Sequence, residues 1–395
     1  MNPTSSYLMR TEKLYEDSKN GYVYEFDATV LDCFPAEDGF YIELDRTSFF
    51  PEGGGQSADE GSLDEYTVKD VRIKDGRILH LIDTSLAIGK VVHGSVDQNV
   101  RFPRMQNHSG EHVISGLIHT LYGFENVGFH MSGSEMTIDT SAPLTSDMIL
   151  KTEREANRAV WENREINCFY PSADDLAQME YRSKTALSGD VRIVEIDGVD
   201  RCACCAPHVR RTGEIGSIHI KEHMKYKKGT RLTVVCGEWA MEDHISLTET
   251  AEKLGRALSS PADGLYNAYM NKEALLADKL CELRSLKEKL LAMRLASLSP
   301  TDKNICVFED GCDTGLLRKL VNDGVHLTGG LFAAFSRKED NLGYAYVIGT
   351  KEGDLAPLAK EISTALGGRG GGKGPMITGF VESDEKTIRE FFDNI

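Results

Sequence analysis

The sequence predicts a multidomain protein of the α+β class, with a small N-terminal β-barrel, an α+β middle part, a helical coiled-coil-like segment and a C-terminal α/β domain. The main observation is that the spacing of apolar residues changes along the 395-residue chain, from alternating runs to helical spacing and then to a mixture of both. The length suits several domains, and 41% hydrophobic with 27% charged residues is typical of a globular protein. We place the parts at residues 1–96, 97–240, 241–300 and 301–395.

The first two parts differ in their local pattern. Residues 22–96 hold short β-rich runs separated by Gly and Asp turns, which favours a small all-β domain or barrel. A helix is then expected after Pro103, and Gly123 ends it. A second helix is expected over 147–164, and strands follow it, so the middle part combines helices with a sheet.

The third part is helical and charged. Leu276, Leu283 and Leu290 recur at every seventh position, which is the spacing of a coiled-coil seam. We expect a helix over 265–295 that forms a helical hairpin or a homodimer contact, and an amphipathic helix packed on its own domain explains the spacing equally well. Residues 303–395 then alternate strand-like and helix-like runs, which predicts a separate α/β domain that offers a second homodimer contact.

Composition bounds the cellular setting. The chain has no run of about 18 apolar residues for a membrane span, and its N-terminal residues carry charges where a signal peptide is apolar. Nine cysteines, three of them in "CACC", suit a reducing compartment better than a disulfide framework. We therefore expect a cytoplasmic protein without membrane contact.

The charge distribution bears on nucleic-acid binding. A net charge of −17 argues mildly against a nonspecific nucleic-acid binder. Two basic segments interrupt the acidic chain: "HVRRTG", with Arg210 and Arg211, and "KEHMKYKKGTR". A solvated surface face accounts for such runs as readily as a binding site does.

Two clusters of histidine and cysteine predict a metal site. His108 and His112 in "NHSGEH" lie four residues apart, so a helix places both imidazoles on one face. His119, seven residues further along the helix, is expected to have a buried or capping role. The segment "CACCAPH" supplies further nitrogen and sulfur ligands, and a tetrahedral shell of such ligands suits Zn²⁺. The members of this second cluster are Cys202, Cys204, Cys205 and His208. The spacing alone leaves open which cysteine binds the metal.

These motifs resemble a known family. "RMQNHSGEHVISG", "NVGFHMSGSEMTID" and "CCAPHVRRTGEIG" are similar to the editing domain of alanyl-tRNA synthetases and of the freestanding AlaX-type alanyl-tRNA editing proteins. "TSFFPEGGGQSADEG" resembles the family's glycine-rich segment, and "GGRGGGKGPMITGF" resembles the C-terminal domain of alanyl-tRNA synthetase. The resemblance covers nearly the whole chain in the order of the long AlaX form.

The resemblance implies a ligand set and an activity. It selects His108, His112, Cys204 and His208 as the zinc ligands, although this chain has Cys-Cys-Ala-Pro-His where the synthetases usually have Cys-Gly-Gly-Thr-His. It implies a trans-editing deacylase that hydrolyses the ester of tRNA(Ala) mischarged with serine or glycine. An aminoacylation domain has no room before the β-rich part, so we expect editing without charging and without ATP. The alternative is a non-catalytic zinc-containing tRNA-binding module.

The pocket residues are less well defined. Gly53, Gly54 and Gly55 would let the backbone approach a substrate closely, and a plain barrel turn is the competing interpretation. Gln56 and His130 are candidates for polar contacts in the pocket, and a structural histidine is an equal alternative for His130.

The C-terminal glycine run 367–374 resembles a Walker A loop only superficially. A phosphate-binding P-loop follows a strand and opens a helix, with Ser or Thr after its lysine. Here the run follows an expected helix, and Gly374 comes after Lys373. The run therefore predicts no nucleotide hydrolysis, and Arg369 and Lys373 are candidates for contacts with RNA phosphates.

Overall fold

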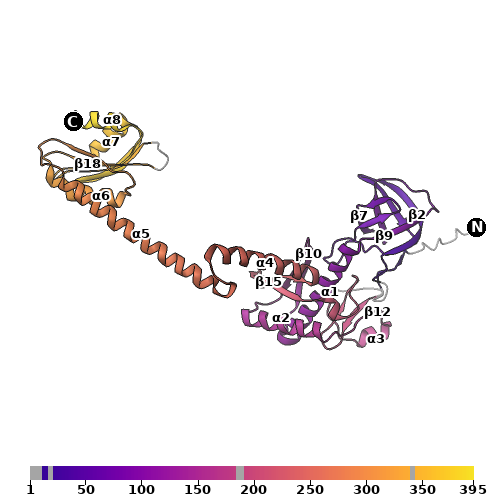
Figure 1. The fold of residues 1–395 in the computed structure, drawn as a ribbon. Helices are drawn as coiled ribbons and strands as arrows, with labels where there is room; N and C mark the ends of the chain where they lie inside the picture. The colour runs from indigo at the N-terminus through magenta and orange to yellow at the C-terminus, as the bar shows by residue number, and fades with distance from the viewer. Residues whose placement is uncertain (1–10, 17–20, 184–190, 339–342) are drawn as a thin grey trace, which may run out of the picture. The chain divides into compact units, whose positions relative to one another are not determined.

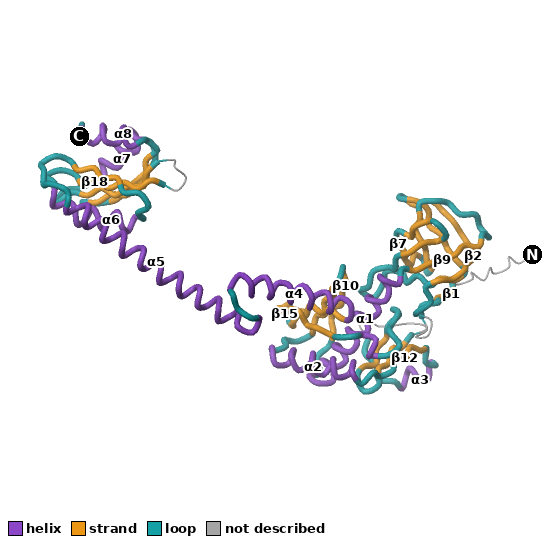
Figure 2. The backbone as a smooth tube through the Cα atoms, viewed as in Figure 1, coloured by secondary structure: helices purple, strands orange, loops and turns teal. Residues whose placement is uncertain are grey.

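A computed structural model describes residues 11–16, 21–183, 191–338 and 343–395 of the chain (Figure 1). The chain separates into two compact units, Met1–Ala251 and Glu252–Ile395. Both contain helices and strands, so the mixed α and β architecture is confirmed (Figure 2). The division into four parts stays a prediction.

The first unit begins with a strongly curved sheet. Seven strands pair in the order β6-β5-β9-β2-β3-β8-β7. The Lys69 N–H, between edge strands β6 and β7, donates to the carbonyl of Leu81 in β8 (2.8 Å), so the sheet nearly closes. Large apolar side chains such as Phe49, Leu44 and Ile42 fill its interior. The strands are β2 (Glu25–Ala36), β3 (Gly39–Leu44), β5 (Gly61–Leu63), β6 (Tyr66–Val68), β7 (Asp70–Lys74), β8 (Arg77–Ile82) and β9 (Val91–Val96), beside the short parallel pair β1 (Glu12–Lys13) and β4 (Arg46–Thr47).

Helix α1 (Gln98–Tyr122) is the central helix of the first unit, and it starts earlier than expected. Asp97 caps it by accepting from the Asn99 N–H (2.9 Å), and Gly123 ends it in a left-handed conformation (φ 68°), as predicted. The expectation that Pro103 precedes the helix is wrong, because Pro103 lies inside it. A proline forfeits one backbone hydrogen bond, and the cap and the largely buried helix face outweigh that loss.

A four-stranded antiparallel sheet, ordered β10-β11-β16-β15, packs with α1 and α2 around the second core. Asn107 ties α1 to the end of β16, because its Oδ1 accepts from the Cys236 N–H (2.8 Å) and its Nδ2 donates to the Cys236 carbonyl (3.2 Å). A three-stranded sheet, β12-β13-β14, completes the unit. The elements are β10 (Asn126–Ser132), β11 (Glu135–Thr140), α2 (Ser146–Trp161), β12 (Ile166–Phe169), α3 (Ala173–Gln178), β13 (Ile193–Ile196), β14 (Asp200–Ala203), η1 (Thr212–Ile215), β15 (Ile218–Tyr226) and β16 (Gly229–Cys236).

Two long helices follow: α4 (Gly237–Leu258), which contains the boundary between the units, and α5 (Leu265–Ala296), with η2 (Ala262–Gly264) between them. The heptad leucines of α5 are exposed, at 54% for Leu276, 49% for Leu283 and 61% for Leu290. The expectation that they pack on their own unit is therefore wrong, and only the last turns of α5, at Leu291, reach the core.

The second unit is built on a five-stranded sheet ordered β17-β18-β19-β21-β20. Helix α7 ends before Gly367 (φ 68°), and the glycines then form edge strand β20, so the predicted order of a helix followed by the glycine run is confirmed. A Cβ on Gly370 would lie 1.9 Å from the Tyr346 hydroxyl. Close packing against Tyr346 therefore explains why a glycine occupies this position. The elements are β17 (Ile305–Phe308), α6 (Thr314–Gly324), η3 (Val325–Leu327), β18 (Phe332–Arg337), β19 (Tyr344–Gly349), α7 (Ala356–Leu366), β20 (Arg369–Gly372), β21 (Met376–Val381) and α8 (Glu385–Asp393).

Candidate metal centre

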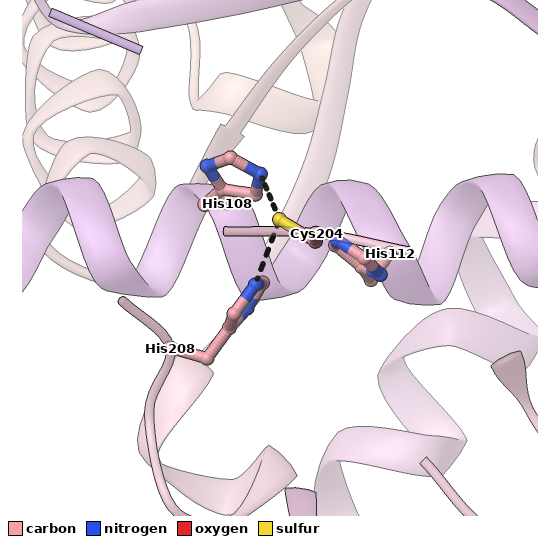
Figure 3. A group of neighbouring side chains, drawn as sticks. All are labelled: His108, His112, Cys204 and His208. Atoms are coloured by element: carbon pink, nitrogen blue, oxygen red, sulfur yellow. Dashed lines mark hydrogen bonds between the residues drawn. The ribbon is translucent and has the colours of Figure 1, made fainter. Parts of the chain in front are cut away.

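Two segments bring four potential ligands together. His108 and His112 lie one turn apart on α1, with ring centroids 5.6 Å apart, and each is only 2% exposed. The loop after β14 brings Cys204 and His208 to the same side of the helix (Figure 3). One donor atom from each of the four residues lies within 4.8 Å of all the others. The four residues that the family resemblance selected therefore converge on one point.

The distances fit a tetrahedral zinc shell. Zinc–nitrogen bonds of about 2.0 Å and zinc–sulfur bonds of about 2.3 Å place the nitrogen and sulfur atoms of a tetrahedron about 3.5 Å apart. The Cys204 Sγ lies 3.4 Å from His108 Nε2 and 3.5 Å from His208 Nε2. These two sulfur–nitrogen distances, and not only the chemical type of the donors, suit Zn²⁺.

Each imidazole is oriented by a hydrogen bond on its other nitrogen. His108 Nδ1 donates to Gln56 Oε1 (2.8 Å), and His112 Nδ1 donates to Asp200 Oδ2 (2.8 Å). His208 Nδ1 lies 3.0 Å from Ser109 Oγ. With the proton on Nδ1 of each ring, Nε2 is the nitrogen that would bind a metal, which is the usual arrangement around protein metal ions.

The electrostatics of the cluster follow from burial and from two carboxylates. Burial lowers the pKa of His208 well below its ordinary value, and His112 and His108 act in the same direction, which keeps the ring neutral. Burial also acts to lower the pKa of His112, but the hydrogen bond to Asp200 and the charge of Glu111 outweigh it, so this pKa is raised. In turn, burial acts to raise the pKa of Asp200, but His112 and Arg182 outweigh it and hold that pKa below its usual range. Arg182 donates to both Asp200 oxygens, at 2.7 and 2.9 Å.

The three cysteines of "CACC" occupy different environments. The Cys204 Sγ lies within 4.8 Å of a ring nitrogen of each of the three histidines. The Cys202 Sγ instead groups with donor atoms of His112 and Asp200. Burial raises the pKa of Cys202 to about 11, which favours its thiol form. Cys205 is exposed. The geometry therefore favours Cys204 as the metal-binding cysteine, a choice that the residue spacing alone left open.

The glycine-rich turn of the first sheet reaches the cluster. Gln56 is 1% exposed, and its side-chain Nε2 has no hydrogen-bond partner among the described residues. Gly55 has φ +86° and lies so close to Phe129 that a Cβ would be 2.5 Å from the Phe129 carbonyl oxygen. Gly54 (φ +61°) and Gly53 are less confined. A buried N–H group without an acceptor normally has a ligand or water as its partner.

The remaining pocket candidates lie outside the cluster. His130 is exposed on β10, next to Phe129, whose ring packs 5.0 Å from that of His108. Of the two roles expected for His119, the buried one is wrong, whereas the capping one agrees with its place in the last turn of α1, where its carbonyl accepts from the Gly123 N–H (2.8 Å). Its side chain is 46% exposed and pairs with Glu125 (2.8 Å) at the end of α1, where a basic group suits the helix dipole.

The four tRNA-binding candidates lie on the surface of two different units. Arg210 stacks on the Tyr22 ring, with its Cζ 4.2 Å from the centroid. Arg211 pairs with Glu165 (3.0 Å) and is partly committed to the fold. Arg369 and Lys373 are exposed in the second unit, at β20 and just after it.

Sequence reasoning missed the residues that orient the potential ligands. Asp200, Arg182 and Ser109 were not identified. Ser109 follows His108 directly, and its position inside the motif was the one available signal. Glu111 accepts from Ser115 Oγ (2.7 Å) and lies 3.8 Å from His112 Nε2, beside the cluster.

Comparison with known proteins first defines a class. Residues 191–232, which contain Cys204 and His208, match the family described as the threonyl and alanyl tRNA synthetase second additional domain. This segment of the chain is thus similar to part of a domain described in threonyl and alanyl tRNA synthetases.

One relative that matches along nearly its whole length, and one that matches over about half of it, narrow this class. The chain is 27% identical over 396 residues to the alanyl-tRNA editing protein AlaX-L of Pyrococcus horikoshii, covering 94% of this chain and 95% of that protein. It is 30% identical over 227 residues to the alanyl-tRNA editing protein Aarsd1 of Rattus norvegicus, covering 53% and 55%. The chain is therefore a relative of the AlaX-type alanyl-tRNA editing proteins, as its motifs predicted.

The ligases are longer proteins. The chain is 28% identical over 394 residues to the alanine–tRNA ligase of Ignicoccus hospitalis and spans 42% of that ligase's length. Among solved structures, the C-Ala domain of Aquifex aeolicus alanyl-tRNA synthetase matches 24% of this chain at 17% identity, with a TM-score of 0.20 that is too low to define a fold. No helix among the described residues is long and apolar enough to cross a membrane.

Proposed function

We propose that this protein is a trans-editing hydrolase that removes serine or glycine from mischarged tRNA(Ala). The observation that carries the proposal is the convergence of His108, His112, Cys204 and His208 within 4.8 Å, in a chain similar along 94% of its length to an alanyl-tRNA editing protein. Editing is needed because a pocket for alanine discriminates weakly against amino acids that differ by one small group. The reaction needs charged tRNA and no ATP, so we place the protein in the cytoplasm.

The chemistry is hydrolysis of an activated ester. Water attacks the carbonyl carbon, the bond to the ribose oxygen breaks, and that oxygen takes up a proton to leave the tRNA with a free terminal hydroxyl. Zinc held by the four ligands would supply a Lewis acid that polarises a carbonyl or lowers the pKa of water. Four protein ligands are typical of a structural shell, so an organising role for the metal is equally consistent with the donor set.

Gln56 is our candidate for the polar contact to the substrate. Its Oε1 accepts from His108 Nδ1, and this fixes the side chain so that Nε2 remains as a buried donor. That N–H is suited to hold an ester or amino-acid oxygen beside the metal. Gly53, Gly54 and Gly55 bring the backbone of the same turn close to the cluster. His130 is too exposed for a buried contact, and we place it at the entrance.

The test is deacylation of three substrates by the purified zinc-loaded protein: Ser-tRNA(Ala), Gly-tRNA(Ala) and Ala-tRNA(Ala). We expect rapid loss of at least one mischarged species while Ala-tRNA(Ala) persists. Cys204→Ala should abolish the activity and the bound zinc, whereas Cys205→Ala, its exposed neighbour, should retain both. If all three substrates decay at the buffer rate while zinc is bound and tRNA still binds, the alternative of a non-catalytic tRNA-binding module holds instead.

The exposed leucines of α5 support a homodimer. Three leucines at heptad spacing with exposures of 49–61% are costly to leave in water, and a partner helix would cover them. We expect sedimentation to show a dimer that Leu276→Lys with Leu283→Lys converts to a monomer. If the wild-type protein sediments as a monomer at high concentration, the homodimer is ruled out. The editing proposal does not depend on this result.

A further inference from the structure

The hairpin formed by β15 and β16 concentrates positive charge at its tip. Residues 218–236 contain five Lys or Arg side chains and one acidic side chain, in a chain of net charge −17. Two of the basic groups are neutralised, Lys221 by Asp243 (2.9 Å) and Arg231 by Asp139 (2.6 Å). The other three are exposed at or beside the turn. They are Lys225, Lys227 and Lys228.

The backbone of the turn shows that a lysine is unusual there. Tyr226 pairs with Gly229, so Lys227 and Lys228 form a two-residue turn, and Lys227 has φ +51°. The other described non-glycine residues at positive φ are all small and polar, as this conformation favours. They are Asp64, Asp75, Asn163 and Ser259. Lys227 departs from the residue choice that the chain makes elsewhere, which points to a use for its charge.

The base of the tip is rigid. Asp139 accepts two hydrogen bonds from Arg231, from Nε (2.6 Å) and Nη2 (2.8 Å). The Arg231 guanidinium stacks on the Tyr226 ring, with Cζ 3.7 Å from its centroid, and Lys227 Nζ lies 5.0 Å from the same centroid. The turn is therefore braced by the Asp139–Arg231–Tyr226 contacts at its base, which lowers the entropy that the turn loses when it binds a partner.

Protection of the sheet edge does not explain the tip. β15 is an edge strand, and lysines on edge strands prevent pairing with other chains. That argument covers Lys225 on the strand, but Lys227 and Lys228 lie beyond the last pair of the ladder.

The tip lies at a useful distance from the metal cluster. β16 runs seven residue steps from Gly229 to Cys236, which is about 23 Å at about 3.3 Å per residue. At the end of β16, the Cys236 backbone N–H donates a hydrogen bond to Asn107, which directly precedes His108 in the sequence. An aminoacyl ester sits on the single-stranded 3′ end of a tRNA, so the base-paired stem must meet the protein well away from the chemistry.

We propose that the turn at Lys227 and Lys228 binds the phosphate backbone of the base-paired acceptor stem while the 3′ end extends to the metal cluster. The inference rests on the proposed function for the identity of the RNA. Phosphate contacts of this kind position a nucleic acid without reading its sequence.

The test removes both charges without disturbing the turn. Lys227→Gly with Lys228→Asn installs residues that two-residue hairpin turns favour, and Lys74→Gln with Lys151→Gln removes two exposed lysines elsewhere in the same unit as a control. Binding of an unacylated acceptor-stem RNA hairpin to the full chain is followed by fluorescence anisotropy across a salt series. Each lost phosphate contact reduces the salt slope by about 0.8, so at about 0.15 M salt we expect roughly 20-fold weaker binding for the turn variant. Lys228→Gln alone should give roughly a 5-fold loss.

Deacylation separates this inference from the proposed function. The turn variant should lose kcat/KM on Ser-tRNA(Ala) but keep it on a seryl-CCA trinucleotide, which lacks the stem. Unchanged RNA binding, or an equal loss on both substrates, overturns the inference. If the wild-type protein hydrolyses neither substrate, the proposed function fails, and the binding experiment still decides whether the turn holds RNA.

Discussion

Asp200 is the most informative position at which to test how the metal centre is held. Its Oδ2 accepts from His112 Nδ1 (2.8 Å) and from Arg182 Nη2 (2.9 Å), while its Oδ1 accepts from Arg182 Nε (2.7 Å). Asp200→Asn preserves the shape of the side chain, but an amide has only one oxygen. If the amide NH₂ takes the place of Oδ1, it faces the Arg182 Nε–H, and two donors oppose each other. If it takes the place of Oδ2, it faces His112 Nδ1, and the His112 proton must then move to Nε2, the nitrogen that would bind the metal.

The expected magnitude follows from these contacts. Loss of a residue that orients a metal-bound histidine weakens metal affinity about 10- to 100-fold, which corresponds to about 1.4–2.7 kcal/mol. We expect this loss for Asp200→Asn in a chelator-competition titration of zinc on the full-length protein.

A matched control exists in the same unit. Asp139 also accepts two hydrogen bonds from one arginine, Arg231 (2.6 and 2.8 Å), but it is not part of the metal cluster. Asp139→Asn should therefore leave zinc affinity unchanged. If Asp200→Asn binds zinc as tightly as the wild type, or if both variants lose affinity equally, the orienting role of Asp200 is refuted.

Further predictions concern the stability of the first unit. Gly55→Ala should lower the free energy of unfolding by about 2–3 kcal/mol, because its Cβ would lie 2.5 Å from the Phe129 carbonyl oxygen. Gly54→Ala, with nothing within 4 Å of its Cβ, should cost only about 1 kcal/mol in the same urea titration. His80 is buried in the curved sheet, where desolvation lowers its pKa from 6.5 to about 4. Since the unfolded state binds the proton more readily, stability should fall as pH drops from 6.5 toward 4, by about 2 kcal/mol at pH 5. His80→Gln should lack this component, and an identical pH dependence in the variant would contradict the assignment.

The sequence was sufficient for features that depend on local spacing. The four-residue interval between His108 and His112 defines one helix face whatever the rest of the fold, and Gly123 ends that helix because glycine adopts positive φ without steric cost. The glycine run could be separated from a P-loop because the order of helix and strand around it is local. The prediction that the helix begins after Pro103 was wrong, because capping by Asp97 and burial of the helix outweigh the loss of one backbone hydrogen bond at the proline.

Features that depend on long-range packing were not accessible. Asp200 lies 88 residues from the histidine that it orients. Gln56 was a candidate for the pocket, but it lies 52 residues from His108, and its hydrogen bond to that ring was not predicted. The choice among three neighbouring cysteines also depends on how the chain turns after β14, which places Cys204 in the cluster and Cys202 beside Asp200. Spacing alone cannot distinguish them, because each forms a loop with His208 that is long enough to enclose a metal.

The metal cluster also explains why the curved sheet belongs to the site. Gln56, from the turn of that sheet, holds His108, and Ala206, between two ligands, is fully buried in the core of the sheet. Arg192 donates to the carbonyls of Cys204 (2.9 Å) and Ala206 (3.0 Å), which fixes the ligand loop against that core. Removing the sheet would therefore release the His108 ring from its hydrogen-bond partner and uncover the loop that carries Cys204 and His208. The glycine-rich sheet and the histidine helix together build a single site, so the first unit should bind zinc and substrate only as a whole.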